Sequence, residues 1–141
     1  MLFYFMQLQS IYLNYLSSSG ISTDTRSLKK GELFFALHGE KFSGNQFAEK
    51  AISLGAIKVI VDDEKISSLG PKVIVVKNTF KTLQELATLH RTKLKTPIIA
   101  ITGSNGKTTT KELVREVLSQ KYSVLATEGN LNNHIGVPLT L

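Results

Sequence analysis

A glycine-rich turn between an apolar segment and a helical segment restricts the fold of this chain more than any other feature. Residues 97–101 are apolar and are typical of a buried strand, whereas residues 111–121 have the composition of a helix. Glycines in the turn let backbone N–H groups approach an anion closely, and the helix N-terminus adds partial positive charge. This order therefore predicts a site for the phosphates of a nucleoside triphosphate.

The spacing inside the turn is shorter than in the standard phosphate loop. That loop is G-x-x-x-x-G-K-[ST], and its first glycine would fall at Ile101. A glycine-rich turn with a solvated lysine is the alternative, but the flanking strand and helix favour phosphate binding. We expect Lys107 to contact the outer phosphates and Thr108 to bind Mg²⁺, both as catalytic groups. The predicted ATP-binding set is Gly103, Ser104, Asn105, Gly106, Lys107, Thr108 and Thr109.

Composition describes an ordinary globular chain. Its 141 residues are 42% hydrophobic and 20% charged, and the absence of cysteine excludes disulfides, cysteine-based zinc sites and a cysteine nucleophile. This composition fits a reducing cytoplasm. The net charge of +6 is scattered, which favours solvated lysines over a nucleic-acid surface. No apolar stretch approaches the roughly 18 residues of a membrane span, and the apolar start of the chain has helical spacing.

Strands alternate with helices along the chain, which predicts an α/β fold with largely parallel pairing. We expect an N-terminal mixed α/β domain at residues 1–78. The first part of a parallel, phosphate-loop α/β domain then follows at residues 79–141. The expected strands are 32–38, 56–62, 72–77, 97–101 and 122–126, the expected helices are 3–16, 46–54, 79–94 and 111–121, and an extended piece covers 21–26.

The last fifteen residues contain three asparagines, two glycines and a proline directly after an expected strand. Ligands of open α/β sheets bind at the carboxyl ends of strands, so this tail is expected beside the phosphate loop. Asparagine can donate and accept hydrogen bonds, which suits sugar hydroxyls and phosphates. An asparagine-rich turn without a ligand is an equally good interpretation of the spacing alone.

The phosphate loop and the tail together resemble the Mur ligases of bacterial cell-wall synthesis. The segments 22–26, 31–39, 47–48 and 54–56 agree with that family as well, so the resemblance spans nearly the whole chain. Within the family, the chain looks most like the members that join D-alanyl-D-alanine to UDP-N-acetylmuramoyl-tripeptide. The resemblance implies an ATP-dependent amide ligase that works through an acyl phosphate, with ATP and Mg²⁺ as cofactors.

The resemblance also implies roles for particular residues. The first domain would bind the UDP end of the substrate through Asp24, Thr25 and Arg26. Thr127, Asn130, Asn132 and Asn133 of the tail would face the nucleotide-sugar and the centre of phosphoryl transfer. From the residues alone, Asp24 to Arg26 indicate a capped turn with a surface salt bridge. Where many relatives carry Asp-Gly-His, this chain has Ser43, Gly44 and Asn45, so the role of those relatives' side chains does not carry over.

The family pattern implies that further metal ligands, the adenine pocket and the dipeptide-binding domain follow Leu141. We therefore expect these residues to be the N-terminal part of a ligase and to be inactive in ligation by themselves. A non-catalytic module that binds a UDP-sugar or a nucleotide is the alternative. The oligomeric state is not predicted by any feature of the sequence.

Overall fold

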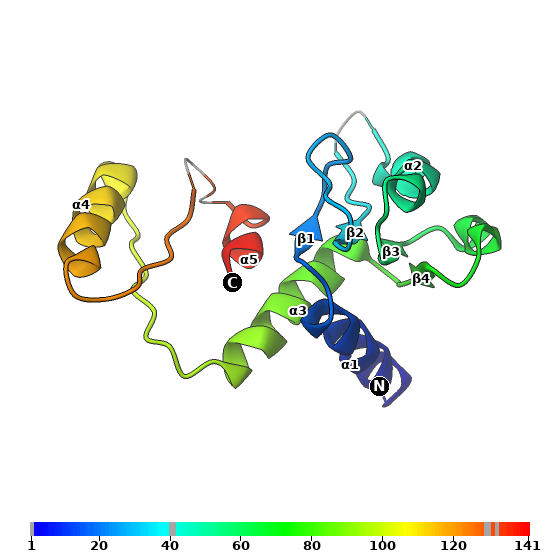
Figure 1. Ribbon diagram of the computed structural model, residues 1–141, viewed down its shortest axis with the longest axis horizontal. Helices are drawn as coiled ribbons and strands as arrows, with labels where there is room; N and C mark the ends of the chain where they lie inside the picture. Colours follow the sequence, from blue (N-terminus) through cyan, green and yellow to red (C-terminus); the bar gives the residue numbers. More distant parts are fainter. Residues whose placement is uncertain (1, 40–41, 129–130, 132) are drawn as a thin grey trace. The chain divides into compact units, whose positions relative to one another are not determined.

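Four short strands pair in parallel to form the sheet of the first part of the chain (Figure 1). They are β1 (Ile21–Ser22), β2 (Leu33–Phe35), β3 (Lys58–Val61) and β4 (Val73–Val75), in the order β1-β2-β3-β4. Phe34 pairs with Val59, and Ile60 pairs with Ile74. The protein is therefore an α/β protein with a parallel sheet, as the alternation of its segments predicts. The computed structural model describes residues 2–39, 42–128, 131 and 133–141.

Helices occupy most of the remaining regular structure. The long helix α3 begins at Thr79 because the side chain of Asn78 accepts a hydrogen bond from the N–H of Lys81, at 2.7 Å. The predicted helices 3–16 and 79–94 are present almost to the residue. The helical elements are α1 (Leu2–Leu16), η1 (Gly44–Phe47), α2 (Ala48–Ser53), η2 (Glu64–Leu69), α3 (Thr79–Lys93), α4 (Lys107–Ser119) and α5 (Gly136–Thr140).

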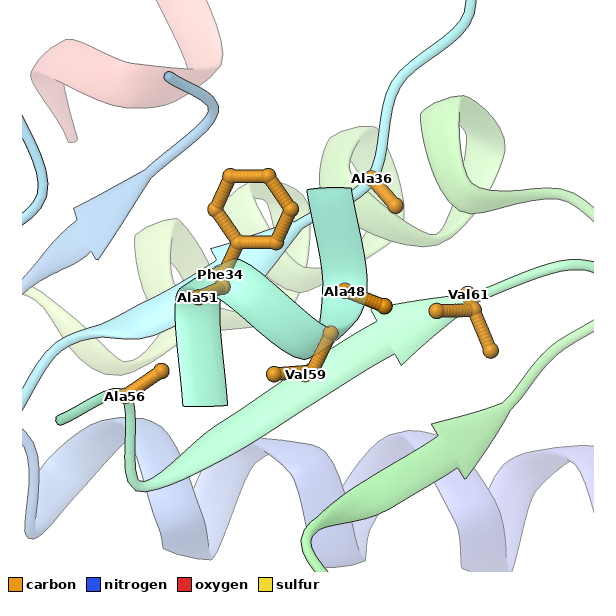
Figure 2. Packing of buried hydrophobic residues seen from close by; sticks show 7 residues of the cluster. All are labelled: Phe34, Ala36, Ala48, Ala51, Ala56, Val59 and Val61. Carbon is orange, nitrogen blue, oxygen red and sulfur yellow. The ribbon is translucent and has the colours of Figure 1, made fainter. Parts of the chain in front are cut away.

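Both faces of the sheet are covered. On one face, Phe34 and Val59 pack with Ala48 and Ala51 of α2, as Figure 2 shows. Because side chains alternate along a strand, Phe35 and Ile60 point to the opposite face, and both are fully buried. Helices α1 and α3 belong to that second layer.

Side-chain hydrogen bonds join α1 to α3 and to the sheet. The Tyr4 hydroxyl of α1 donates to the carboxylate of Glu85 in α3. The side-chain amide of Gln7 donates to the Val75 carbonyl oxygen of β4, at 2.6 Å. Helix α1 is therefore a packed part of the fold, as its spacing predicts.

The chain divides into two units, residues 1–89 and 90–141. The division falls later than the boundary near Asn78 that we predicted. Its physical reason is that Leu83 and Leu86 of α3 are buried in the first unit, at 1% and 2% exposure. Most of α3 therefore belongs to the first unit and does not open the second.

The second unit differs from the prediction in its strands. Residues 97–101 and 122–126 were expected to form strands, but within the described residues neither has a paired neighbour and neither is regular structure. A strand needs a neighbour to satisfy its N–H and C=O groups, and no described segment supplies one. Ile99 and Leu125 are accordingly 61% and 81% exposed.

An open apolar surface accompanies these unpaired segments. Leu113 and Val117 of α4 are exposed, and with Ile99, Val114 and Leu118 they line an apolar hollow of about 290 Å³. A phosphate-loop unit with one long helix cannot bury its own faces, so this exposure is the expected consequence. None of the described helices is long and apolar enough to span a membrane.

Amide hydrogen exchange is expected to separate the two units. The amides of β2 and β3 are hydrogen-bonded inside a buried sheet, whereas residues 97–101 and 122–126 have no ladder. We expect the latter to exchange several orders of magnitude faster in a residue-resolved exchange experiment. Equal protection of residues 1–78 and of the chain after Pro97 would contradict this picture.

Candidate functional site

The phosphate loop leads directly into α4. Gly106 precedes the first helical residue and has a left-handed backbone, with φ of +76°. L-residues with a β-carbon rarely adopt this conformation, so glycine at this position lets the chain turn sharply into the helix. The first turn of α4 contains no acidic residue and its N-terminus receives no side-chain cap. Its free N–H groups and helix dipole therefore suit an anion.

Lys107, the first residue of α4, folds back over the loop. Its ammonium group donates to the Gly103 carbonyl oxygen at 2.6 Å and lies 3.5 Å from that of Ser104. The charge thus stands over the turn that the predicted phosphates would occupy. The Gly103 carbonyl oxygen keeps the Lys107 ammonium group close to the loop. A γ-phosphate bound there could replace this oxygen as the hydrogen-bond acceptor.

Thr108 and Thr109 follow in the first turn of α4, and both are exposed, as are Ser104 and Asn105. An exposed hydroxyl at this position suits one coordination position of Mg²⁺, which keeps several waters and takes its other ligands from phosphates. The described residues hold no group of three or more His, Cys, Asp or Glu that could bind a metal. Thr108 therefore fits a metal that arrives with a nucleotide better than a resident one.

Lys111 of α4 contacts the start of the tail. Lys111, one turn after Lys107, donates from Nζ to the Thr127 carbonyl oxygen at 2.5 Å and also contacts Glu112 at 2.9 Å. Its side chain is only 15% exposed. The start of the tail thus lies against α4, whereas its predicted position beside the phosphate loop stays a prediction.

Asn133 stabilises the turn of the tail that precedes α5. Its side-chain oxygen accepts from the N–H groups of Ile135 and Gly136, at 3.0 and 2.8 Å, where α5 begins. This geometry is that of an asparagine turn, the alternative that the spacing left open. The predicted contacts Asn130 and Asn132 lie outside the described residues.

The predicted UDP residues lie at the carboxyl end of β1. Asp24 accepts from the backbone N–H of Arg26 at 2.9 Å and from its guanidinium at 2.5 to 3.0 Å. Thr25 is buried, whereas the Arg26 side chain is 86% exposed. The capped turn with a salt bridge is present, and it leaves the remaining guanidinium donors of Arg26 open to a phosphate.

The hydrogen bonds from Arg26 lower the pKa of Asp24 from 3.8 to about 2. A lowered pKa in the folded state means that the pair stabilises the turn above about pH 4. This contribution is lost as the pH falls through about 2. We expect an NMR titration of the Asp24 carboxyl carbon to give a midpoint near 2 and Arg26→Ala to raise it toward 3.8. An unchanged midpoint in the variant would show that Arg26 is not the cause.

A further polar cluster at the same edge of the sheet was not predicted. His38 follows β2, Asp62 follows β3 and Thr79 begins α3 after β4, so all three lie at carboxyl ends of strands. Nε2 of His38 lies 2.6 Å from Oδ1 of Asp62, which also accepts from Asn45 at 2.9 Å. Ligands of open α/β sheets bind at the carboxyl ends of strands. This rule, applied to the end of each expected strand, would have identified the cluster.

Asp62 is the centre of this cluster. Burial by itself would raise its pKa, but hydrogen bonds from His38, Asn45 and the Thr79 N–H outweigh burial and lower the pKa below its ordinary value. Asp62 is therefore a carboxylate at neutral pH. The Asn45 side chain lies against Asp62, where it donates to Oδ1 and accepts from the Asp62 N–H.

Two family models together match most of the chain. A family model described as "Mur ligase family, catalytic domain" matches residues 17–101, more than half of the chain, and "Mur ligase middle domain" matches residues 101–141. The chain belongs to the Mur ligase family. The junction of the two matches lies at Ile101, directly before the phosphate loop, so the loop opens the middle domain of the Mur ligase.

Two curated relatives of this Mur ligase are each named UDP-N-acetylmuramoyl-tripeptide–D-alanyl-D-alanine ligase. The Bacillus subtilis protein is 45% identical over 123 residues, and the Synechocystis protein is 48% identical over 125. These alignments cover 86% and 87% of this chain but 27% of each relative. The chain thus spans about a quarter of the length of the relatives that it matches.

Solved structures give the same result. MurF ligase from Thermotoga maritima in complex with ADP matches with a TM-score of 0.77 and 30% identity, over 89% of this chain and 29% of that one. MurF from Acinetobacter baumannii matches with a TM-score of 0.78 and 32% identity, over 96% and 31%. Both units of this Mur ligase therefore have counterparts in MurF structures.

Proposed function

We propose that this chain forms part of an ATP-dependent ligase that joins D-alanyl-D-alanine to UDP-N-acetylmuramoyl-tripeptide in peptidoglycan synthesis. The observation that carries the proposal is the phosphate loop, where Lys107 stands over the turn at the uncapped N-terminus of α4. The names of the curated relatives supply the substrates. Because the reaction uses ATP and a uridine nucleotide, the cytoplasm is the compartment that we expect.

In this reaction ATP phosphorylates the terminal carboxylate of the tripeptide. The amine of D-alanyl-D-alanine then attacks the acyl phosphate, which gives the amide and releases phosphate beside ADP. Lys107 stabilises the charge that spreads over the transferred phosphoryl group. Thr108 binds Mg²⁺, and the loop N–H groups and the hydroxyl of Thr109 hold the phosphates.

The two units divide the substrates between them. The first unit holds the UDP end, with Arg26 as the cation for the diphosphate and Asp24 holding the Arg26 side chain in place. The tail after Thr127 supports the sugar and the transfer centre, and Lys111 holds its first residue to α4. The chain spans only 27% of the length of the two curated relatives, so we expect no ligation from these 141 residues alone.

Calorimetry on the 141-residue chain tests the proposal. We expect separate binding of UDP-N-acetylmuramoyl-tripeptide and of Mg-ATP, without ADP release that depends on D-alanyl-D-alanine. Arg26→Ala should weaken only the first ligand. Binding of the uridine nucleotide without Mg-ATP would favour the non-catalytic module, and binding of neither would contradict the proposal.

A further inference from the structure

The imidazole of His38 stands at the edge of the sheet in a fixed orientation. His38 is the third residue after β2, and its Nε2 lies 2.6 Å from the Asp62 carboxylate. The His38 side chain is 44% exposed, whereas that of Asp62 is 14% exposed. Nε2 thus contacts the less exposed Asp62, and the His38 side chain remains partly open to solvent.

Asp62 is itself held from three directions. Oδ1 accepts from Asn45 at 2.9 Å, and Oδ2 lies 3.4 Å from the N–H and 3.3 Å from the hydroxyl of Thr79. Asn45 in turn accepts from the Asp62 N–H at 3.4 Å. The carboxylate therefore has little freedom to turn away from the imidazole.

The backbone beneath His38 is equally constrained. A β-carbon on Gly44 would lie 2.2 Å from the Leu37 carbonyl oxygen, so the segment before Asn45 packs directly on the residue before His38. The N–H of Ala36 donates to the Ile60 carbonyl oxygen at 2.9 Å, which extends the pairing of β2 with β3. His38 thus projects from a rigid end of the sheet.

This geometry determines which atom His38 can offer a ligand. A carboxylate only accepts hydrogen bonds, so Nε2 must carry the hydrogen. In the neutral ring, Nδ1 then has a lone pair and accepts a hydrogen bond. A phosphate oxygen offers no hydrogen to Nδ1, whereas an imide N–H or a ribose hydroxyl does. The exposed guanidinium of Arg26, at the end of β1, is the better partner for phosphate.

We propose that His38 is a specificity residue for the nucleoside, accepting at Nδ1 a hydrogen bond from the uracil imide or a ribose hydroxyl. Asp62 and Asn45 are the positioning residues that fix its tautomer and direction. This inference rests on the proposed function, because it requires the first unit to bind a uridine nucleotide. It adds to that function the atom that recognises the nucleoside.

UDP binding to the 141-residue chain tests the role of His38. His38→Ala should weaken binding about three- to tenfold, the effect of one neutral hydrogen bond. His38→Asn can place an amide oxygen near the position of Nδ1 and should recover most of the affinity. His90→Ala, which removes an imidazole from α3, is the matched control and should bind as the unaltered chain does.

Two analogues identify the donor. If the imide donates, the diphosphate of 3-methyluridine should bind the unaltered chain more weakly, and His38→Ala should lose no further affinity for it. If the ribose 2′-hydroxyl donates, 2′-deoxy-UDP should bind the unaltered chain more weakly, and His38→Ala should lose no further affinity for it; 3′-deoxy-UDP tests the 3′-hydroxyl in the same way. UDP binding that is equal in the unaltered chain and His38→Ala would overturn the inference but not the proposed function. Failure of the unaltered chain to bind UDP would count against both.

The positioning role has its own measurement. Asp62→Asn introduces an amide that can donate to Nε2, which should move the ring hydrogen to Nδ1 and remove the acceptor. We expect the loss of UDP affinity to match that of His38→Ala, with the tautomer change visible in a long-range ¹H–¹⁵N spectrum of the imidazole. An unchanged tautomer with unchanged affinity would show that Asp62 has no positioning role.

Discussion

Replacing Phe34 by alanine is expected to lower the free energy of unfolding of the first unit by about 3–5 kcal/mol. Phe34 is 1% exposed and belongs to the cluster between β2, β3 and α2. Its neighbours Ala48 and Ala51 are too small to fill the space that the ring leaves. Urea unfolding followed by circular dichroism measures the change.

Phe5→Ala is the matched control, because it removes the same ring from a position on α1 that is 57% exposed. We expect it to change the free energy of unfolding by less than about 1 kcal/mol. Equal losses from the two variants would mean that the layer between α2 and the sheet does not supply the stability of this unit. A loss confined to Phe34→Ala supports the packing described here.

Lys107→Met is expected to weaken Mg-ATP binding by roughly 10- to 100-fold, the range for a hydrogen bond that involves a charged group. The methionine keeps much of the side-chain length but removes the ammonium group. The lysine now donates to the Gly103 carbonyl oxygen, and it must exchange this partner for a phosphate when the nucleotide binds. Calorimetric titration with Mg-ATP measures the loss.

Lys95→Met serves as the control for net charge, because Lys95 is exposed and precedes the loop. The control should bind Mg-ATP within about twofold of the unaltered chain, since a distant surface charge is screened by salt. UDP binding to the first unit should stay unchanged in both variants. Equal weakening by both lysine variants would indicate a general charge effect and would contradict the role of Lys107.

The two strands that were expected in the second unit show that a local sequence pattern does not determine strand pairing. Residues 59–61 and 97–101 are both apolar, yet the former are buried in β3, whereas Ile98 and Ile99 of the latter are exposed. Hydrophobicity indicates that a segment can be buried, but a strand also needs a neighbour for its hydrogen bonds. Residues 58–61 pair with β2 and β4, whereas no described segment pairs with residues 97–101.

The two candidate sites also differ in how far the sequence predicted them. The glycine turn and the helix after it were predictable because they depend on local order, whereas their role in binding phosphate stays a prediction. The cluster of His38 and Asp62 was not predicted, because its members are 24 residues apart and meet only when β2 and β3 pair. The role of Asn45 was likewise decided by its contact with Asp62.

The sequence by itself determined the long helices, the α/β class and the glycine turn before α4, since each depends on residues close together in the chain. It also contained the family pattern that both halves share with the Mur ligases. Only the tertiary structure decided where the first unit ends, which apolar segments are paired and which way His38 is held. These features depend on groups that are distant in sequence, and local composition does not specify which of them come into contact.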